Sequence, residues 1–216
     1  VLIDAFTYAK ENNKKVHFLG LVSDGGVHSH TSHLRGLITA SQEYGLENVF
    51  VHAFTDGRDV DPKSGKQYIQ DLEDFMAPTT AKLASVVGRY YAMDRDKRWE
   101  RVKLAYDLVV NGTGKPTQDA VAAIEESYAK DVTDEFIDPL VVVDATNQPL
   151  ATIQADDVVI FFNFRTDRGR ELTEALSQKD FHEQNMHKLP LYYVTLTNYD
   201  ETYENVKVVY NKDNIT

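Results

Sequence analysis

Arginine is concentrated at three places in this chain, and its side chain is well suited to binding anions. Eight of the nine arginines are Arg58 and those within residues 89–101 and 165–170, whereas the lysines are spread along the chain. The formal net charge is -11, so this clustering does not follow from a basic composition. A guanidinium group offers a planar fork of donors that matches phosphate and carboxylate oxygens. The sequence therefore predicts a pocket for a small phosphorylated acid.

Length and composition restrict the class of protein further. The 216 residues are 42% hydrophobic and 11% aromatic, which is enough for a substantial core. The acidic balance argues against a nucleic-acid partner or an anionic membrane surface. No apolar run approaches the ~20 residues of a membrane span, and the lack of cysteine is compatible with a cytoplasmic location. The chain starts at Val1 within an amphipathic pattern, so we expect it to be a piece of a longer protein.

Apolar, β-branched runs alternate with segments of helical periodicity. Strands are predicted at residues 16–22, 49–54, 83–87, 158–162 and 191–196. Strands that alternate with helices pair mainly in parallel, and near-continuous apolar strands suit a sheet that is covered on both faces. We therefore predict an α/β fold with a mainly parallel sheet flanked by helices on both faces. A further apolar run at 140–143 predicts a short antiparallel addition around residues 140–155.

A polar cluster follows each of four predicted strands. The clusters are residues 23–30, 55–61, 88–95 and 163–170, and they contain most of the arginines. The carboxyl ends of parallel strands share one edge of a sheet, and ligands of open α/β sheets bind outside that edge. We therefore expect the four clusters to converge on one site.

Arg165 and Arg168 are three residues apart, so at the start of a helix they would lie on one face. They could instead form exposed ion pairs with Asp167 and Glu171, which are worth only ~0–1 kcal/mol. The positive end of the helix dipole disfavours cations, however, and a bound anion would offset their repulsion. We prefer the binding interpretation.

Arg89 follows an apolar strand directly, so burial or ligand contact is expected for it. The charges over residues 94–101 alternate in sign, which is typical of a solvated helix face. We expect that simpler explanation to hold for Lys97, Arg98 and Arg101.

Asp59 is a candidate general base for a substrate hydroxyl. The alternative is a structural role, in which Asp59 pairs with Arg58 or caps the following helix. The residues alone do not separate these two roles.

Three histidines, His28, His30 and His33, suggest a metal site. Their run is similar to the His-x-His-x-Asp-His cluster of metallo-β-lactamase-type hydrolases, but the Asp is missing and the last His is displaced. We therefore prefer His28 as a hydrogen-bond donor to phosphate or as a proton carrier.

Four ordered motifs closely resemble cofactor-independent phosphoglycerate mutase, a member of the alkaline phosphatase superfamily. They are DGGVHSH at 24–30, TDGRDV at 55–60, GRYYAMDR at 88–95 and FNFRTDR at 162–168. The family joins a metal-bearing phosphatase domain to an inserted substrate-binding (phosphotransferase) domain. The resemblance implies that residues 1–216 are the inserted domain alone and that the metal-bearing domain lies outside this chain.

The resemblance also implies a reaction and the residues that serve it. The family is an isomerase of glycolysis and gluconeogenesis that interconverts 3-phosphoglycerate and 2-phosphoglycerate through a phosphoserine in the metal-bearing domain. Two Mn²⁺ ions are expected in that domain, no bisphosphoglycerate is needed, and no metal is expected on this chain. Asp59 would transfer a proton. The implied substrate contacts are His28, Arg58, Asp59, Arg89, Arg95, Arg165 and Arg168.

By this interpretation the chain alone has no mutase activity and binds phosphoglycerate weakly, because it supplies half of a cleft. Two other hypotheses stay open. One is a stand-alone phosphate- or anion-binding module, and the other is a metal-dependent hydrolase that uses His28, His30 and His33.

Overall fold

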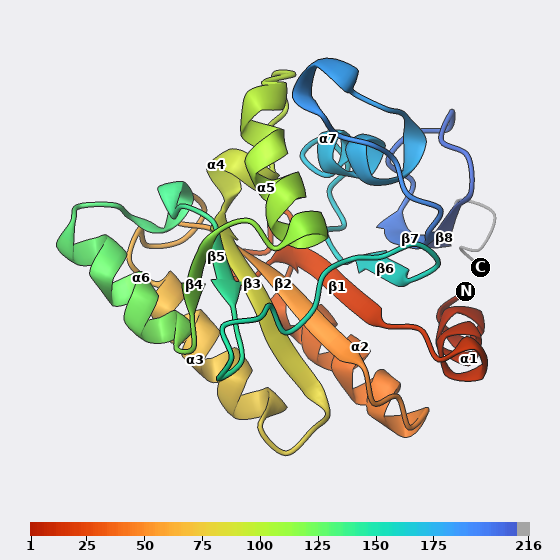
Figure 1. The fold of residues 1–216 in the computed structure, drawn as a ribbon, viewed down its shortest axis with the longest axis horizontal. Helices are drawn as coiled ribbons and strands as arrows, with labels where there is room; N and C mark the ends of the chain where they lie inside the picture. The colour runs from red at the N-terminus through yellow and green to blue at the C-terminus, as the bar shows by residue number, and fades with distance from the viewer. Residues whose placement is uncertain (211–216) are drawn as a thin grey trace.

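The computed structural model of the chain describes residues 1–210, which form one mixed sheet with helices packed on it (Figure 1). The spatial order of the strands is β4-β5-β3-β2-β1-β6-β7-β8. The strand bounds are β1 Val16–Leu21, β2 Val49–Thr55, β3 Ala81–Gly88, β4 Lys115–Thr117, β5 Leu140–Val142, β6 Val158–Phe161, β7 Tyr192–Thr197 and β8 Val206–Tyr210. The five predicted main strands are all present, within about two residues of their expected ends.

Helices connect most of the strands. Their bounds are α1 Leu2–Asn12, α2 Thr31–Glu43, α3 Gly65–Met76, α4 Arg89–Ala92, α5 Trp99–Asn111, α6 Ala120–Ala129 and α7 Arg170–Thr173. A turn of π-helix over Glu174–Gln178 continues α7, and short 3₁₀ turns lie at Asp134–Phe136 and His182–Gln184. Within residues 1–210, none of these helices combines the length and the apolar character needed to span a bilayer.

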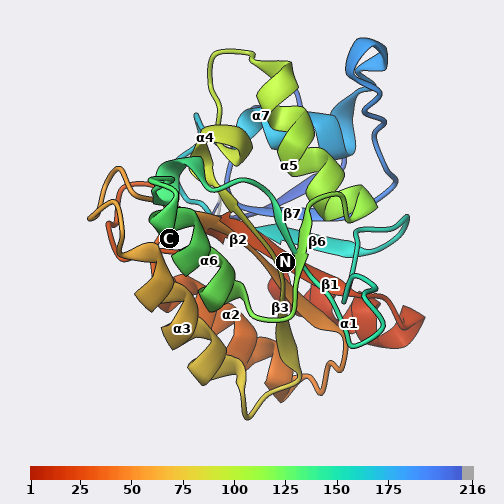
Figure 2. The same ribbon diagram turned by 60° about the vertical axis from the view of Figure 1, so that its left-hand side comes forward.

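Two apolar clusters, one on each face of the sheet, form the core. On one face, buried side chains of β1, β2 and β3 pack against α1, α2, α3 and α6. On the other face, alternate residues of the same strands pack against α5 and α7. The two views agree with this three-layer arrangement (Figures 1 and 2). Strands buried on both faces explain why their sequences are apolar runs rather than alternating patterns.

Successive strands are added to opposite sides of the central strand, β1. β1 pairs in parallel with β2 on one side and with β6 on the other. The strands β2 and β3 extend the sheet one way, and β7 and β8 extend it the other way. Such a switch point leaves a crevice between the loops that follow the two central strands. Here those loops are residues 22–30 after β1 and 162–169 after β6.

The predicted antiparallel addition is confirmed, because β5 pairs antiparallel with β3 and Val143 bridges Pro149. Two edge strands lie outside the predicted set. β4 has a largely exposed Lys115–Thr117 sequence that contains a proline. Among residues 1–210, β8 pairs only with β7, and it is half-exposed. Edge strands need little apolar surface, so their amino-acid composition gives only a weak indication of a strand.

Candidate functional site

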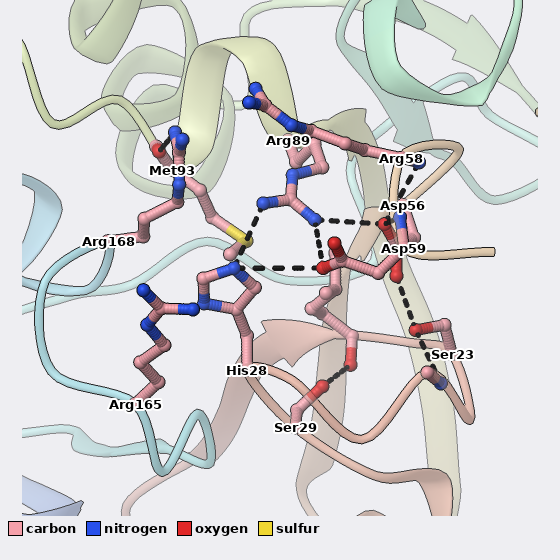
Figure 3. Close-up of polar contacts among 12 residues, drawn as sticks. Ser23, His28, Ser29, Asp56, Arg58, Asp59, Arg89, Met93, Arg165 and Arg168 are labelled. Atoms are coloured by element: carbon pink, nitrogen blue, oxygen red, sulfur yellow. Dashed lines mark hydrogen bonds and ion pairs between the residues drawn. The ribbon is translucent and has the colours of Figure 1, made fainter.

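The four polar clusters that follow β1, β2, β3 and β6 meet at the carboxyl edge of the sheet. Figure 3 shows Arg89 directed at His28, Asp56 and Asp59, with Arg165 and Arg168 on the His28 side and the side chain of Arg58 extending from beside Asp56 across Arg89. The loops at the switch point are joined through their backbones, because the carbonyl of His28 accepts from the N–H of Phe164 at 2.8 Å. Residues that are distant in sequence are therefore brought to one place.

Arg89 is the centre of this arrangement. It begins α4 directly after β3 and is 3% exposed. Its Nη1 donates to Asp56 Oδ1 at 2.9 Å and to Asp59 Oδ2 at 2.8 Å. Its Nη2 lies 3.0 Å from His28 Nε2. One guanidinium group thus links the loops after β1, β2 and β3, as expected from its position at the end of an apolar strand.

Asp56 holds the loop after β2 in place. Its Oδ1 accepts from the backbone N–H groups of Arg58 at 3.1 Å and Asp59 at 2.9 Å, and its Oδ2 accepts from Ser23 Oγ at 2.7 Å. Burial favours a higher pKa for Asp56. Hydrogen bonds from Asp59, Ser23 and Arg58 and the charge of Arg89 outweigh it and lower the pKa below the usual value. Asp56 is a buried anion that orients its neighbours.

His28 presents an unused donor to the site. A guanidinium group can only donate, so His28 Nε2 accepts from Arg89 and the ring proton is on Nδ1. His28 is 3% exposed, and its Nδ1 has no hydrogen-bond partner within the described chain. A buried N–H without a partner is costly, so a ligand oxygen is its natural acceptor.

The lowered pKa of His28 predicts that the folded protein becomes less stable in acid. Burial, and then the charge of Arg89, lower the pKa of His28 to about 4. Between pH 6.5 and 4 the unfolded state therefore binds more protons at this ring, so the free energy of unfolding should decrease as pH falls through that window. Urea unfolding at several pH values should show a shallower decrease for His28→Gln. The exposed His33→Gln variant is the control, and equal slopes for the three proteins would contradict the prediction.

The four other arginines predicted to contact the substrate, Arg58, Arg95, Arg165 and Arg168, lie around Arg89. Their side chains are less constrained than that of Arg89. Arg58, Arg95 and Arg165 are each about half exposed, at 53%, 51% and 49% of their side-chain surface. Their ion pairs with Glu135 at 3.8 Å and with Asp167 at 3.7 and 3.2 Å are surface contacts of low strength. A ligand can therefore displace these pairs at little cost.

Positive charge accumulates around Arg168. Its Nη1 donates to the carbonyl of Met93 at 3.1 Å. Partial burial and the charges of Arg89, Arg95 and Arg58 lower its pKa. These four arginines and Arg101 line a cavity of about 240 Å³, and Asp94, Asp96 and Glu135 lie in the same lining. Five guanidinium groups outnumber the three carboxylates, so this cavity is suited to a small multiply charged acid.

Several sequence-based interpretations need correction. Arg165 and Arg168 lie in the turn before α7, which begins at Arg170, and so they do not occupy a helix start. Arg101 is not a simple solvated side chain: it lies 3.9 Å from the centre of the Tyr90 ring, 3.5 Å from Asp94 Oδ1, and lines the cavity. Asp59 pairs with Arg89 rather than with Arg58, and Ser64 rather than Asp59 precedes α3.

The three histidines do not converge. His30 accepts from the backbone N–H of Ser32 and caps α2, while His33 packs edge-on against Phe164. Only His28 faces the arginines. Among residues 1–210, no group of three or more His, Asp or Glu side chains is placed to hold a metal ion. This geometry does not support the hydrolase hypothesis.

Two side chains of the site, Asp56 and Ser23, were not among the candidates from the sequence. Asp56 is the second residue of the TDGRDV motif and the first residue after β2, which is a signal that could have marked it. Ser23 has no comparable signal, because its importance comes from its contact with Asp56 across two loops.

The fold and the cavity define an α/β protein with an arginine-lined cavity at the carboxyl edge of its sheet. Residues 1–201 match the family model described as the BPG-independent PGAM N-terminus. The chain belongs to the family of BPG-independent phosphoglycerate mutases, which confirms the resemblance carried by the four motifs.

Relatives and a solved structure agree with this assignment. The chain is 82% identical over its full length to the 2,3-bisphosphoglycerate-independent phosphoglycerate mutase of Flavobacterium johnsoniae, and covers 43% of that protein. It is 55% identical over 98% of its length to the enzyme of the same name from Parabacteroides distasonis, and covers 42% of it. A crystal structure of Leishmania mexicana phosphoglycerate mutase at low cobalt concentration matches 93% of the chain with a TM-score of 0.82 and 31% identity. The chain covers 41% of that structure.

Proposed function

We propose that residues 1–216 are the substrate-binding domain of a phosphoglycerate mutase that interconverts 3-phosphoglycerate and 2-phosphoglycerate. The proposal depends on one observation: Arg58, Arg89, Arg95 and Arg168 line the same cavity. Burial and the charges of the other three arginines lower the pKa of Arg168 there. The relatives are more than twice as long as this chain. The proposal places the metal-bearing phosphatase domain, with the serine that takes up the phosphoryl group, in the remainder of that length.

The chain's own residues have separable roles in this proposal. Arg58, Arg95, Arg165 and Arg168 neutralise the carboxylate and phosphate and retain glycerate between the two transfers. Arg89 orients His28 and Asp59, and His28 donates its Nδ1 proton to a ligand oxygen. The recorded contacts of Asp59, with Arg89 and His28, both use Oδ2. Its Oδ1 is therefore the atom that would accept a proton from a glycerate hydroxyl.

Metal ions would activate the serine and stabilise transferred charge when bound. We propose two Mn²⁺ ions in the domain outside this chain, since the side chains of residues 1–210 do not form a fitting donor set. The chain alone should have no mutase activity. A cytoplasmic location completes the proposal, because both phosphoglycerates are intermediates of glycolysis and gluconeogenesis.

Calorimetric titration tests the proposal. The protein should bind 3-phosphoglycerate more tightly than inorganic phosphate, because a carboxylate that pairs with arginine adds charge-assisted hydrogen bonds of ~1.5–3 kcal/mol each. One such bond corresponds to roughly tenfold in affinity. Glycerate without phosphate should bind weakly. Equal affinity for phosphate and phosphoglycerate would indicate a general anion-binding module instead, and stoichiometric metal in the purified chain would revive the hydrolase hypothesis.

A further inference from the structure

A short segment between α6 and β5 is fastened to two of the strand ends that lead into the site. We call this segment, residues 134–138, the strap. The carbonyl of Asp134 accepts from Oγ1 of Thr55, the last residue of β2, at 2.7 Å. The carbonyl of Ile137 accepts from the N–H of Gly88, the last residue of β3, at 2.8 Å. The strap is therefore bonded to both strands at the points where they end.

The side chain of Asp134 anchors the strap from the side of the helices. Asp134 is 0% exposed, and its Oδ2 accepts from the N–H of Gly65 at 2.7 Å. Its Oδ1 accepts from the hydroxyl group of Tyr128, whose oxygen in turn accepts from the N–H of Lys66 at 3.2 Å. The carboxylate thus joins the strap to the start of α3 and to the last turn of α6. A buried carboxylate that loses such donors is costly, so this anchor holds the strap firmly.

Two glycines allow the strap to lie directly against the backbone of the site. Gly57 precedes Arg58 and has a φ of +65°, and a Cβ atom there would lie 2.7 Å from the backbone nitrogen of Glu135. Gly88 precedes Arg89, and a Cβ atom there would lie 2.7 Å from the carbonyl carbon of Glu135. These distances are too short for any side chain. The backbone of the strap is therefore the support against which two arginine-bearing segments rest.

The strap also forms part of the cavity wall. Oε1 of Glu135 lies 3.8 Å from Nη1 of Arg58. The ring of Phe136 packs on that of Tyr90, with 5.1 Å between the ring centres. All four side chains line the cavity. A displaced strap would therefore change the shape of the cavity as well as the support of its arginines.

We propose that Asp134 is a positioning residue, which holds the strap against the 56–61 loop and Arg89 and so keeps their side chains in place for the substrate. This role rests on the proposed function. Asp134 itself is buried and does not contact the substrate. Without its anchor the strap moves away from the two glycines, and the arginines and Asp59 lose their support. A misplacement of about 1 Å that starts far from the reacting atoms can cost roughly 100-fold in rate.

Kinetics of the full-length protein test this role. Asp134→Ala should lower kcat/KM for 3-phosphoglycerate by about 100-fold. Tyr128→Phe leaves Gly65 bonded to Asp134 and should cost about tenfold, the loss of one hydrogen bond to a charged group. It keeps the test valid if Asp134→Ala does not fold. Tyr8→Phe is the matched control, because it also removes a tyrosine hydroxyl, one that donates to the carbonyl of Asp156 at the opposite edge of the sheet.

The assay separates positioning from stability. Each variant is measured below the onset of its own thermal unfolding, so a loss of stability alone leaves kcat/KM unchanged. Tyr8→Phe should match the unmodified protein. A kcat/KM for Tyr128→Phe equal to that of Tyr8→Phe would overturn the inference.

Hydrogen exchange of the full-length protein gives a second measurement that needs no ligand. A purely local role would accelerate exchange in Tyr128→Phe only at Lys66, whose N–H loses its acceptor. Positioning through the strap predicts a loss of protection also at the amides of Arg58 and Asp59, which donate to Asp56. Unchanged protection at those two amides would refute the inference. Loss of protection there, in a protein that does not bind 3-phosphoglycerate, would instead refute the proposed function alone.

Discussion

Arg89→Ala is expected to lower the free energy of unfolding by about 3–5 kcal/mol, because it leaves buried carboxylates without their counter-charge. The side chain of Asp56 is 1% exposed and that of Asp59 is 20% exposed, so water cannot replace the lost guanidinium at Asp56. The Nε2 of His28 also loses its donor. The loops after β1, β2 and β3 then lose their common contact, and phosphoglycerate binding should be lost with it.

Urea unfolding and calorimetric titration of the same preparations test this result. Arg98→Ala is the matched control, since Arg98 is exposed and uses only its backbone N–H towards Asp94. It should change stability by no more than about 0.5 kcal/mol. Arg89→Lys separates charge from geometry, because an ammonium group lacks the planar fork that reaches three partners. We expect it to recover part of the stability and little of the binding. Unchanged unfolding of Arg89→Ala would show that the three loops are held by other contacts.

Asp59→Asn in the full-length protein is expected to reduce kcat by roughly 10²–10⁴-fold, the usual contribution of a positioned general base. Asp59 is the more accessible of the two carboxylates on Arg89, which suits a group that must meet a substrate hydroxyl. Asparagine keeps an oxygen that accepts from Arg89 but cannot take up a proton. The loss should therefore appear in kcat, while KM changes little.

The Asp59→Asn variant also distinguishes the two roles that the sequence leaves open for Asp59, which are general base and structural partner. Asp61→Asn is the control, because Asp61 lies on the same loop and is exposed, and its side chain accepts only from the backbone N–H of Lys63 among the contacts of the described chain. Its steady-state kinetics should match those of the unmodified protein. A raised KM with unchanged kcat for Asp59→Asn would assign Asp59 to holding Arg89, with no part in proton transfer.

The positions of the strands and of the candidate site follow closely from the sequence. Apolar runs that are buried on both faces have few alternatives to a parallel sheet, and parallel strands place their carboxyl ends together. His28, Arg58, Arg89, Arg95 and Arg168 could for that reason be assigned to one edge before any contact was known. Family motifs at the same four strand ends reinforce the assignment.

The contacts within the site could not be obtained in the same way. The interpretation of residues 165–168 as a helix start was wrong, because the chain forms a turn there and α7 begins only at Arg170. The solvated role expected for Arg101 was wrong as well, since Tyr90 and Asp94 are brought under it by α4 and the loop before α5. A local charge pattern does not indicate which side chains from other segments will pack against it.

The sequence by itself determined the α/β class, the family and the edge of the sheet at which anion-binding groups gather, because periodicity and motifs are local properties of the chain. Only the tertiary structure decided that Asp56 and Arg89 form the centre of the site and that the Nδ1 of His28 has no hydrogen-bond partner among residues 1–210. These features depend on burial and on distances of a few ångströms between loops, and both arise only when the sheet assembles.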